Sequence, residues 1–317
     1  MKLFPLPRSA LSPLLRATAL EVAVFFGHLL LYPSGIRPEP TTGPTGSAVP
    51  TGPTGAVGAV GPTGPAGYTA TAGPTTATAP TAPTATTGPT AATGSATATA
   101  LPSAGGFLPP VVLLHGFADN RSVFVLLRRS LARHGWCHLT SLNYSPLTCD
   151  IRTAAGLLGR HVEEICARTG HREVDIIGHS LGGLIARYYT QRLGGDTRVR
   201  TLVTLGTPHE GTRVAPPMSA HPLVRQMRPG SSLIEELARP APGCRTRFVS
   251  FWSDLDQLML PVETARIHHP DLIAQNVQVS GIGHLALPVH PAVAAGIRQV
   301  LQTPEQTAAT TGSSSVA

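Results

Sequence analysis

The strongest constraint on folding is a long uncharged block in the first third of the chain. It runs for 67 residues, from Pro40 to Gly106, and consists almost wholly of Thr, Pro, Ala and Gly. Such a composition buries too little apolar surface to offset the entropy that is lost when the backbone is ordered. The 317-residue chain is therefore expected to hold one packed domain, preceded by a disordered linker over residues 37–106.

Part of this linker carries glycine at every third position, from Gly52 to Gly67. This is the collagen pattern, and a triple helix would make the protein a trimer. However, Val49 and Ala70 break the repeat on either side. The preferred interpretation is a flexible, partly polyproline-II spacer that holds a monomeric domain away from a membrane or cell wall.

Residues 1–36 carry three basic side chains ahead of an apolar run from Ala17 to Tyr32, which Glu21 and His28 interrupt. Positive charge before an apolar stretch is typical of exported proteins. The run is shorter than the roughly 20 residues that span a bilayer, and no small-x-small cleavage site follows it. A signal peptide, an uncleaved signal anchor and an amphipathic helix docked on the core all remain open. Either export interpretation predicts a secreted or extracytoplasmic, membrane-anchored protein.

A regular pattern covers residues 107–303, and a disordered tail is predicted over residues 304–317. Short apolar runs alternate with helical stretches, which predicts an α/β domain with a mostly parallel sheet and helices on both faces. Catalytic groups in such sheets gather at the carboxyl ends of the strands. The expected strands are Val111–Leu114, Cys137–Leu142, Val174–Ile177, Val199–Leu205, Thr246–Phe251 and Asn276–Ser280, and the clearest helices are Ile151–Arg168 and Leu181–Arg192.

Ser180 lies in the sequence Gly178-His179-Ser180-Leu181-Gly182, between an expected strand and an expected helix. That is the context in which the G-x-S-x-G motif holds a nucleophilic serine. The glycines leave room for a strained turn that exposes the hydroxyl, and the following helix directs N–H groups toward developing negative charge. The pattern predicts Ser180 as the catalytic nucleophile.

A serine nucleophile needs a base, and the base needs an orienting acid, which follow the serine in the order Asp or Glu, then His. His284 directly follows the last expected strand and is the predicted base. Asp256 is the preferred acid, with Asp254, Glu263 and Asp271 as alternatives.

Two backbone N–H groups are expected to bind the oxyanion of the tetrahedral intermediate. The first belongs to Leu181, directly after the nucleophile, and the second to Phe117, in the loop after the first core strand. Three histidines near these positions are expected to be structural: His115, His179 and His209.

The core motifs resemble those of secreted bacterial lipases and esterases of the α/β-hydrolase fold. The resemblance covers Leu108 to Leu301 and rests on these segments: His115-Gly116-Phe117, Gly178-His179-Ser180-Leu181-Gly182-Gly183, Gly206-Thr207-Pro208-His209-Glu210-Gly211-Thr212, Asp256…Pro261 and Gly283-His284. It implies a minimal α/β hydrolase with about six mostly parallel strands. The excess of Arg over Lys indicates a GC-rich genome, such as that of an actinobacterium.

The resemblance also bears on the acid. In the family the acid lies in a Ser-x-x-Asp-x-x-x-x-Pro stretch, which Ser253, Asp256 and Pro261 match, and this favours Asp256 over Asp254. Met259 departs from the pattern, because the family more often has Val there.

The segment Thr212–Gly243 contains six prolines and is predicted to form a lid or one wall of an acyl pocket. Its candidate lining residues are Met218, Leu223, Val224 and Met227. The four cysteines are an even set for which three disulfide pairings are open, namely those among Cys137, Cys149, Cys166 and Cys244.

The function expected from these patterns is an exported serine hydrolase that cleaves carboxylic or lipid esters without a metal or cofactor. A cell-surface acyltransferase with the same groups and a non-catalytic stalked surface protein are the alternatives. The core holds 20 Arg against 14 Asp and Glu, which favours association with anionic membrane or wall surfaces. No basic cluster with interleaved aromatics is present, so no nucleic-acid partner is expected.

Overall fold

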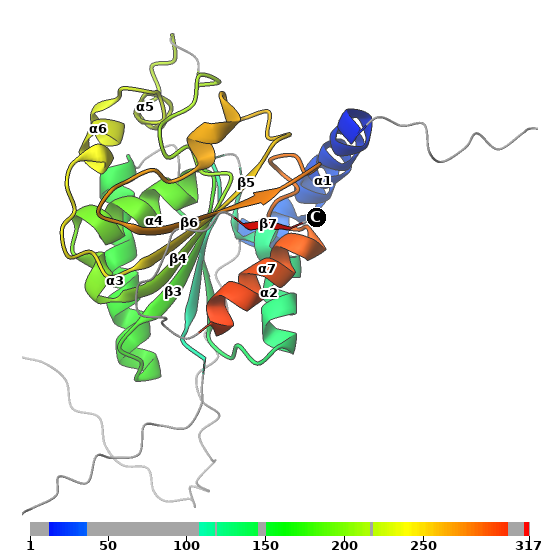
Figure 1. Cartoon of the computed structure of the whole chain (residues 1–317). Helices are drawn as coiled ribbons and strands as arrows, with labels where there is room; N and C mark the ends of the chain where they lie inside the picture. Colours follow the sequence, from blue (N-terminus) through cyan, green and yellow to red (C-terminus); the bar gives the residue numbers. More distant parts are fainter. Residues whose placement is uncertain are drawn as a thin grey trace, which may run out of the picture. The chain divides into compact units, whose positions relative to one another are not determined.

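The computed structural model describes residues 13–36, 108–117, 119–144, 150–215, 218–303 and 314–316. The predicted linker over residues 37–106 lies outside these described residues. The core is a parallel sheet with helices on both faces (Figure 1), as the alternating pattern predicted.

The sheet has the strand order β2-β1-β3-β4-β5-β6-β7, and every neighbouring pair is parallel. The six expected strands are all present. A seventh, β7, pairs with β6 at the edge and comes from the segment predicted as a disordered tail. The strands are β1 (Val111–Leu114), β2 (Leu139–Leu142), β3 (Val174–His179), β4 (Val199–Leu205), β5 (Arg247–Ser253), β6 (Ile273–Val279) and β7 (Ser314–Val316).

Strand β1 shows why both faces of the sheet need cover. Val112 and Leu114 belong to one apolar cluster, whereas Val111 and Leu113 belong to the other, and all four are buried. Successive side chains of a strand point to opposite faces, so a strand with apolar residues at every position must be covered twice.

Four helices provide most of this cover (Figure 1). On one face, α3 (Ile151–Thr169) and α4 (Leu181–Arg192) contribute to the first cluster, and on the other, α2 (Val125–Arg133) and α7 (Pro291–Gln302) contribute to the second. The remaining short elements are η1 (Arg121–Phe124), η2 (Gly195–Thr197), α5 (Pro222–Gln226), α6 (Ser232–Ala238) and η3 (Val262–Ala265).

The N-terminal segment forms helix α1 (Pro13–Ile36). Within the part of the chain that the structure describes, no helix combines the length and the apolar character needed to cross a bilayer.

Candidate active site

Ser180 lies between the end of β3 and the start of α4, with φ 51° and ψ −118°. Among the described residues it is the one non-glycine with a positive φ, a conformation that costs free energy and is retained mainly at functional sites. Gly182 allows the turn, because a Cβ at that position would overlap the carbonyl group of Leu114 in β1. The chain is thus strained at Ser180 and packed closely around it.

His284 and Asp256 form a buried hydrogen-bonded pair. His284 follows β6 and Asp256 follows the adjacent strand β5, so parallel pairing brings the two loops together. The Nδ1 of His284 lies 2.8 Å from Oδ2 and 3.0 Å from Oδ1 of Asp256, and it must donate because a carboxylate only accepts. Oδ1 of Asp256 also accepts from the backbone N–H groups of Leu258 and Met259, at 3.0 and 3.2 Å. The acid is therefore fixed from two sides.

The other three candidate acids have surroundings that do not include His284. Asp254 is exposed, and its Oδ1 accepts from the N–H of Gly281 at 3.0 Å. Asp271 accepts from the N–H of Ala241 at 2.7 Å, and Glu263 lies in η3. Of the four carboxylates considered from the sequence, the structure brings Asp256 to His284.

The electrostatic surroundings of His284 favour its charged form. Burial by itself lowers the pKa of this histidine, but the charge of Asp256 and its hydrogen bond outweigh that effect. Asp119 and Glu21 add further negative charge nearby, so the pKa of His284 is raised above its usual 6.5. A base with this pKa accepts a proton readily, and Asp256 stabilises the imidazolium that results.

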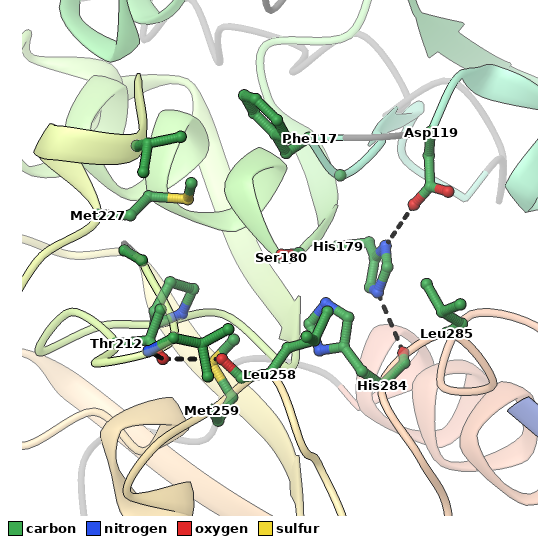
Figure 2. A pocket seen from close by; sticks show the side chains of 15 residues that line it. Phe117, Asp119, His179, Ser180, Thr212, Met227, Leu258, Met259, His284 and Leu285 are labelled. Carbon is green, nitrogen blue, oxygen red and sulfur yellow. Dashed lines mark hydrogen bonds and ion pairs between the residues drawn. The ribbon is translucent and has the colours of Figure 1, made fainter. Parts of the chain in front are cut away.

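Ser180 and His284 line one cavity of about 260 Å³, shown in Figure 2. Phe117 lines it as well, and Leu181 is the first residue of α4, where an N–H group has no acceptor within the helix. Most of the wall is apolar. Its apolar residues are Phe117, Pro208, Val214, Ala215, Val224, Met227, Leu258, Met259 and Leu285.

The four residues predicted to line an acyl pocket divide into two groups. Val224 and Met227, in and next to α5, line the cavity. Leu223 instead belongs to the buried core, and Met218 is 93% exposed. The segment after Thr212 therefore contributes one wall of the cavity, and the Thr212 hydroxyl ties it to the opposite loop by donating to the carbonyl of Leu258 at 2.8 Å.

A second histidine, His179, contacts His284. The Nε2 of His179 donates to the carbonyl oxygen of His284 at 3.2 Å, and its Nδ1 lies 3.2 Å from Oδ2 of Asp119 (Figure 2). The rings of His179 and His284 are 4.8 Å apart between centroids. His179 thus supports the loop of the predicted base. The sequence analysis missed Asp119, which stands two residues after Phe117 and belongs to no motif.

The two other histidines have partners away from the reacting groups. Nδ1 of His115 lies 2.8 Å from the carbonyl oxygen of Gly116, and burial lowers the pKa of its ring. Nε2 of His209 lies 3.0 Å from the hydroxyl of Thr204; burial, aided by the charge of Arg187, lowers its pKa well below the usual value. Both contacts suit histidines that hold loops in place.

No disulfide joins the three cysteines that the structure describes, Cys137, Cys166 and Cys244. Cys149 lies outside the described residues. Within those residues there is also no group of three or more His, Cys, Asp or Glu side chains arranged to hold a metal ion.

Comparison with known proteins relates the core to one fold. The family described as "alpha/beta hydrolase fold" matches residues 109–238. A triacylglycerol lipase of Pseudarthrobacter phenanthrenivorans is 32% identical over 118 residues, which are 33% of this chain and 35% of the relative. A triacylglycerol lipase of Burkholderia plantarii is also 32% identical over 118 residues, 33% of this chain and 31% of the relative. The chain thus matches about a third of the length of these curated relatives.

Solved structures give the same result for the fold. The mature form of the Bacillus licheniformis lipase BlEst2 superposes with a TM-score of 0.53 at 15% identity, covering 62% of this chain and 92% of that one. Aspergillus fumigatus lipase B gives a TM-score of 0.54 at 16% identity, covering 64% and 55%. The core therefore has the α/β-hydrolase fold.

Proposed function

We propose that this chain is a serine hydrolase that cleaves carboxylic esters with apolar acyl groups. The observation that carries the proposal is the buried Asp256–His284 pair on the same cavity as Ser180, a serine held in a strained strand-to-helix turn. The α/β-hydrolase fold and the lipase relatives support an ester as the substrate.

In the proposed reaction, the Oγ of Ser180 attacks the acyl carbon of the ester while Nε2 of His284 takes the hydroxyl proton. The N–H groups of Phe117 and Leu181 bind the oxyanion that forms, each worth about 3 kcal/mol of transition-state stabilisation in comparable sites. His284 then protonates the leaving alkoxide, and an acyl group remains on Ser180. Water, activated by His284, attacks this acyl-enzyme, releases the acid and restores the serine.

The cavity supports an apolar acyl group as the recognised part of the substrate. Its volume of about 260 Å³ lies just below the roughly 300–1,000 Å³ typical of sites for drug-sized ligands. We therefore expect short and medium acyl chains to fit fully, and longer chains to extend beyond the cavity.

The proposed place of action lies outside the cytoplasm. This part of the proposal is supported by the basic residues Lys2, Arg8 and Arg16 ahead of the apolar run. Fractionation of the producing cells, followed by mass determination of the N-terminus, tests it. Recovery of the full protein in the cytoplasmic fraction alone would contradict it.

The activity is tested with p-nitrophenyl esters of graded chain length and the purified full chain, with and without Ser180→Ala. We expect turnover that peaks at short to medium chains, and a loss of at least about 10³-fold in the variant, because no other group supplies the nucleophile. An inactive wild-type chain, or an equally active Ser180→Ala variant, would refute the proposal.

A further inference from the structure

Helix α1 meets the catalytic core with one defined face. Glu21 and Val24, three residues apart, lie on the same side of the helix. Val24 packs against the apolar cluster that α2 and α7 share, and Glu21 is half-buried. In contrast, Val22, Phe25 and Phe26 have exposed fractions of 51%, 54% and 57%.

Glu21 binds the backbone directly after the predicted catalytic base. Its Oε2 accepts from the N–H of Leu285 at 3.0 Å, and its Oε1 accepts from the N–H of Ala286 at 2.9 Å. These N–H groups open the turn that begins at His284. Ala286 is completely buried, so its N–H is shielded from solvent while Glu21 is in place, and a buried N–H without an acceptor is costly.

The Glu21 side chain also crosses Gly283, the residue before the base. A Cβ at position 283 would overlap the Cγ and Cδ of Glu21, so the glycine leaves the space that this side chain occupies. Glu21 therefore contacts the chain on both sides of His284.

A second contact joins the same helix to the element that follows the loop of the predicted oxyanion donor. Helix α1 packs against η1, which begins four residues after Phe117. Helix α1 thus lies against the turn that carries the base and against η1, which follows the loop of the predicted oxyanion donor. This turn and this loop lie far apart in the sequence and reach the cavity independently.

We propose that α1 is a permanent part of the catalytic domain and that Glu21 is a positioning residue that fixes the backbone of His284. This inference rests on the proposed function. A hydrogen bond to a charged acceptor is about twice as strong as a neutral one, and Glu21 makes two to adjacent residues. Small displacements of a catalytic group are expensive in rate, so a loosened turn at His284 slows the reaction without removing any reacting atom.

The proposal is tested by comparing Glu21→Ala, Glu21→Gln and the control Val22→Ala in the full chain. Val22 neighbours Glu21 on α1 but faces away from the core. For Glu21→Ala we expect kcat on p-nitrophenyl butyrate to fall about tenfold, because the N–H groups of Leu285 and Ala286 both lose their acceptor, with KM within about twofold. Glu21→Gln keeps one of the two acceptor oxygens but turns its NH2 group toward the other N–H, so it should restore kcat only in part.

The pH profile separates the charge of Glu21 from its hydrogen bonds. The charged and titratable groups around His284 are Asp256, Asp119, His179 and Glu21. Because the negative charge of Glu21 raises the pKa of His284, Glu21→Gln should move the acidic limb of kcat/KM to lower pH. Val22→Ala should leave both kcat and the limb unchanged. If the pH profile of kcat/KM for Glu21→Gln were identical to that of the wild type, the proposed effect of Glu21 on His284 would be contradicted.

Hydrogen exchange tests the contact independently of ester turnover. In Glu21→Ala the amides of Leu285 and Ala286 should exchange at least about tenfold faster than in the wild type, and in Val22→Ala they should not. Unchanged exchange would overturn the inference whether or not the chain hydrolyses esters. Faster exchange with an unchanged kcat would overturn the positioning role. A wild-type chain that turns over no ester would refute the proposed function, while the exchange comparison would still decide the contact.

The inference also predicts which form of the chain is active. Because Glu21 lies inside α1, the active protein must retain this helix, so the exported protein of the proposed function keeps its N-terminal segment uncleaved and docks it on the catalytic domain. Intact mass determination of the purified active protein should show a chain that includes residues 13–36. A fully active mature chain that begins after Ile36 would overturn the inference.

Discussion

Two carboxylates hold the short segment around His284, and they reach it from opposite parts of the chain. Asp256 comes 28 residues earlier, from the loop after β5, and binds the imidazole ring. Glu21 comes 264 residues before Leu285, from α1, and binds the backbone. Parallel pairing of β5 with β6 delivers the first contact, whereas only the docking of a separate helix delivers the second.

The two contacts also differ in what they control. Asp256 determines which nitrogen of His284 carries the proton, and in the proposed reaction it stabilises the imidazolium that forms. Glu21 binds the backbone of Leu285 and Ala286, by which we propose that it fixes the position of the ring, and it contributes a more distant charge. A change at Asp256 should therefore cost far more activity than a change at Glu21.

The largest effect is expected from Asp256→Asn. The Asn side chain keeps the oxygen that accepts from Leu258 and Met259, so the fold should survive. Its amide would donate to Nδ1 of His284 and hold the ring in the wrong tautomer, which costs about 10⁴-fold in kcat in comparable triads. Steady-state kinetics of ester hydrolysis measure the loss.

Asp254→Asn is the matched control for this prediction. Asp254 is exposed and bonds Gly281, so we expect less than about a threefold change in kcat. A greater loss of kcat in Asp254→Asn than in Asp256→Asn would show that Asp254, and not Asp256, is the acid.

Glu21→Ala is expected to cost less activity than Asp256→Asn, and less again when Asp256 is already replaced. In the Asp256→Asn background His284 is already in the wrong tautomer, so fixing its backbone matters less. We predict that Glu21→Ala costs about tenfold in the wild type but less than about threefold in that background, a non-additivity typical of groups that share a partner. A double-mutant cycle on kcat measures it, and full additivity would show that the two carboxylates act separately.

The smallest effect is expected from Asp119→Asn. The charge of Asp119 contributes to the raised pKa of His284, so its removal should lower that pKa. The free base then persists to lower pH, and the acidic limb of kcat/KM should shift downward with little change in the plateau. Glu235→Gln, an exposed site on α6, serves as the charge control. An upward shift, or an equal shift in the control, would refute this role of Asp119.

Sequence patterns predicted the parts of the site that lie at the ends of the expected strands. The bounds expected for β1, β4 and α4 are those observed, because buried strands and an elbow helix leave strong local signals. His284 was identified because it directly follows the last expected strand, and Asp256 because it follows the strand before and matches the Ser-x-x-Asp-x-x-x-x-Pro stretch of the family that the core resembles. The structure then brought these two residues into contact.

The remaining parts had no local signal. Glu21 stood in the sequence as an interruption of an apolar run, and nothing in its neighbours indicates a partner at Leu285 and Ala286. The division of the proposed pocket residues also depends on packing: Leu223 and Val224 are adjacent, yet one is buried in the core and the other lines the cavity. Strand β7 forms one edge of the sheet, although the sequence analysis predicted a disordered tail over the residues that contain it.

The most direct test of the central claim is covalent labelling of the full chain with a p-nitrophenyl alkylphosphonate, which mimics the tetrahedral intermediate. We predict one phosphonyl group per chain, located on Ser180 by peptide mass mapping, with one equivalent of p-nitrophenolate released. Labelling should be at least about 10³-fold slower in His284→Ala, since the base activates the serine. Labelling at another residue, or equally fast labelling of Ser180 without His284, would contradict a catalytic site built on Ser180, His284 and Asp256.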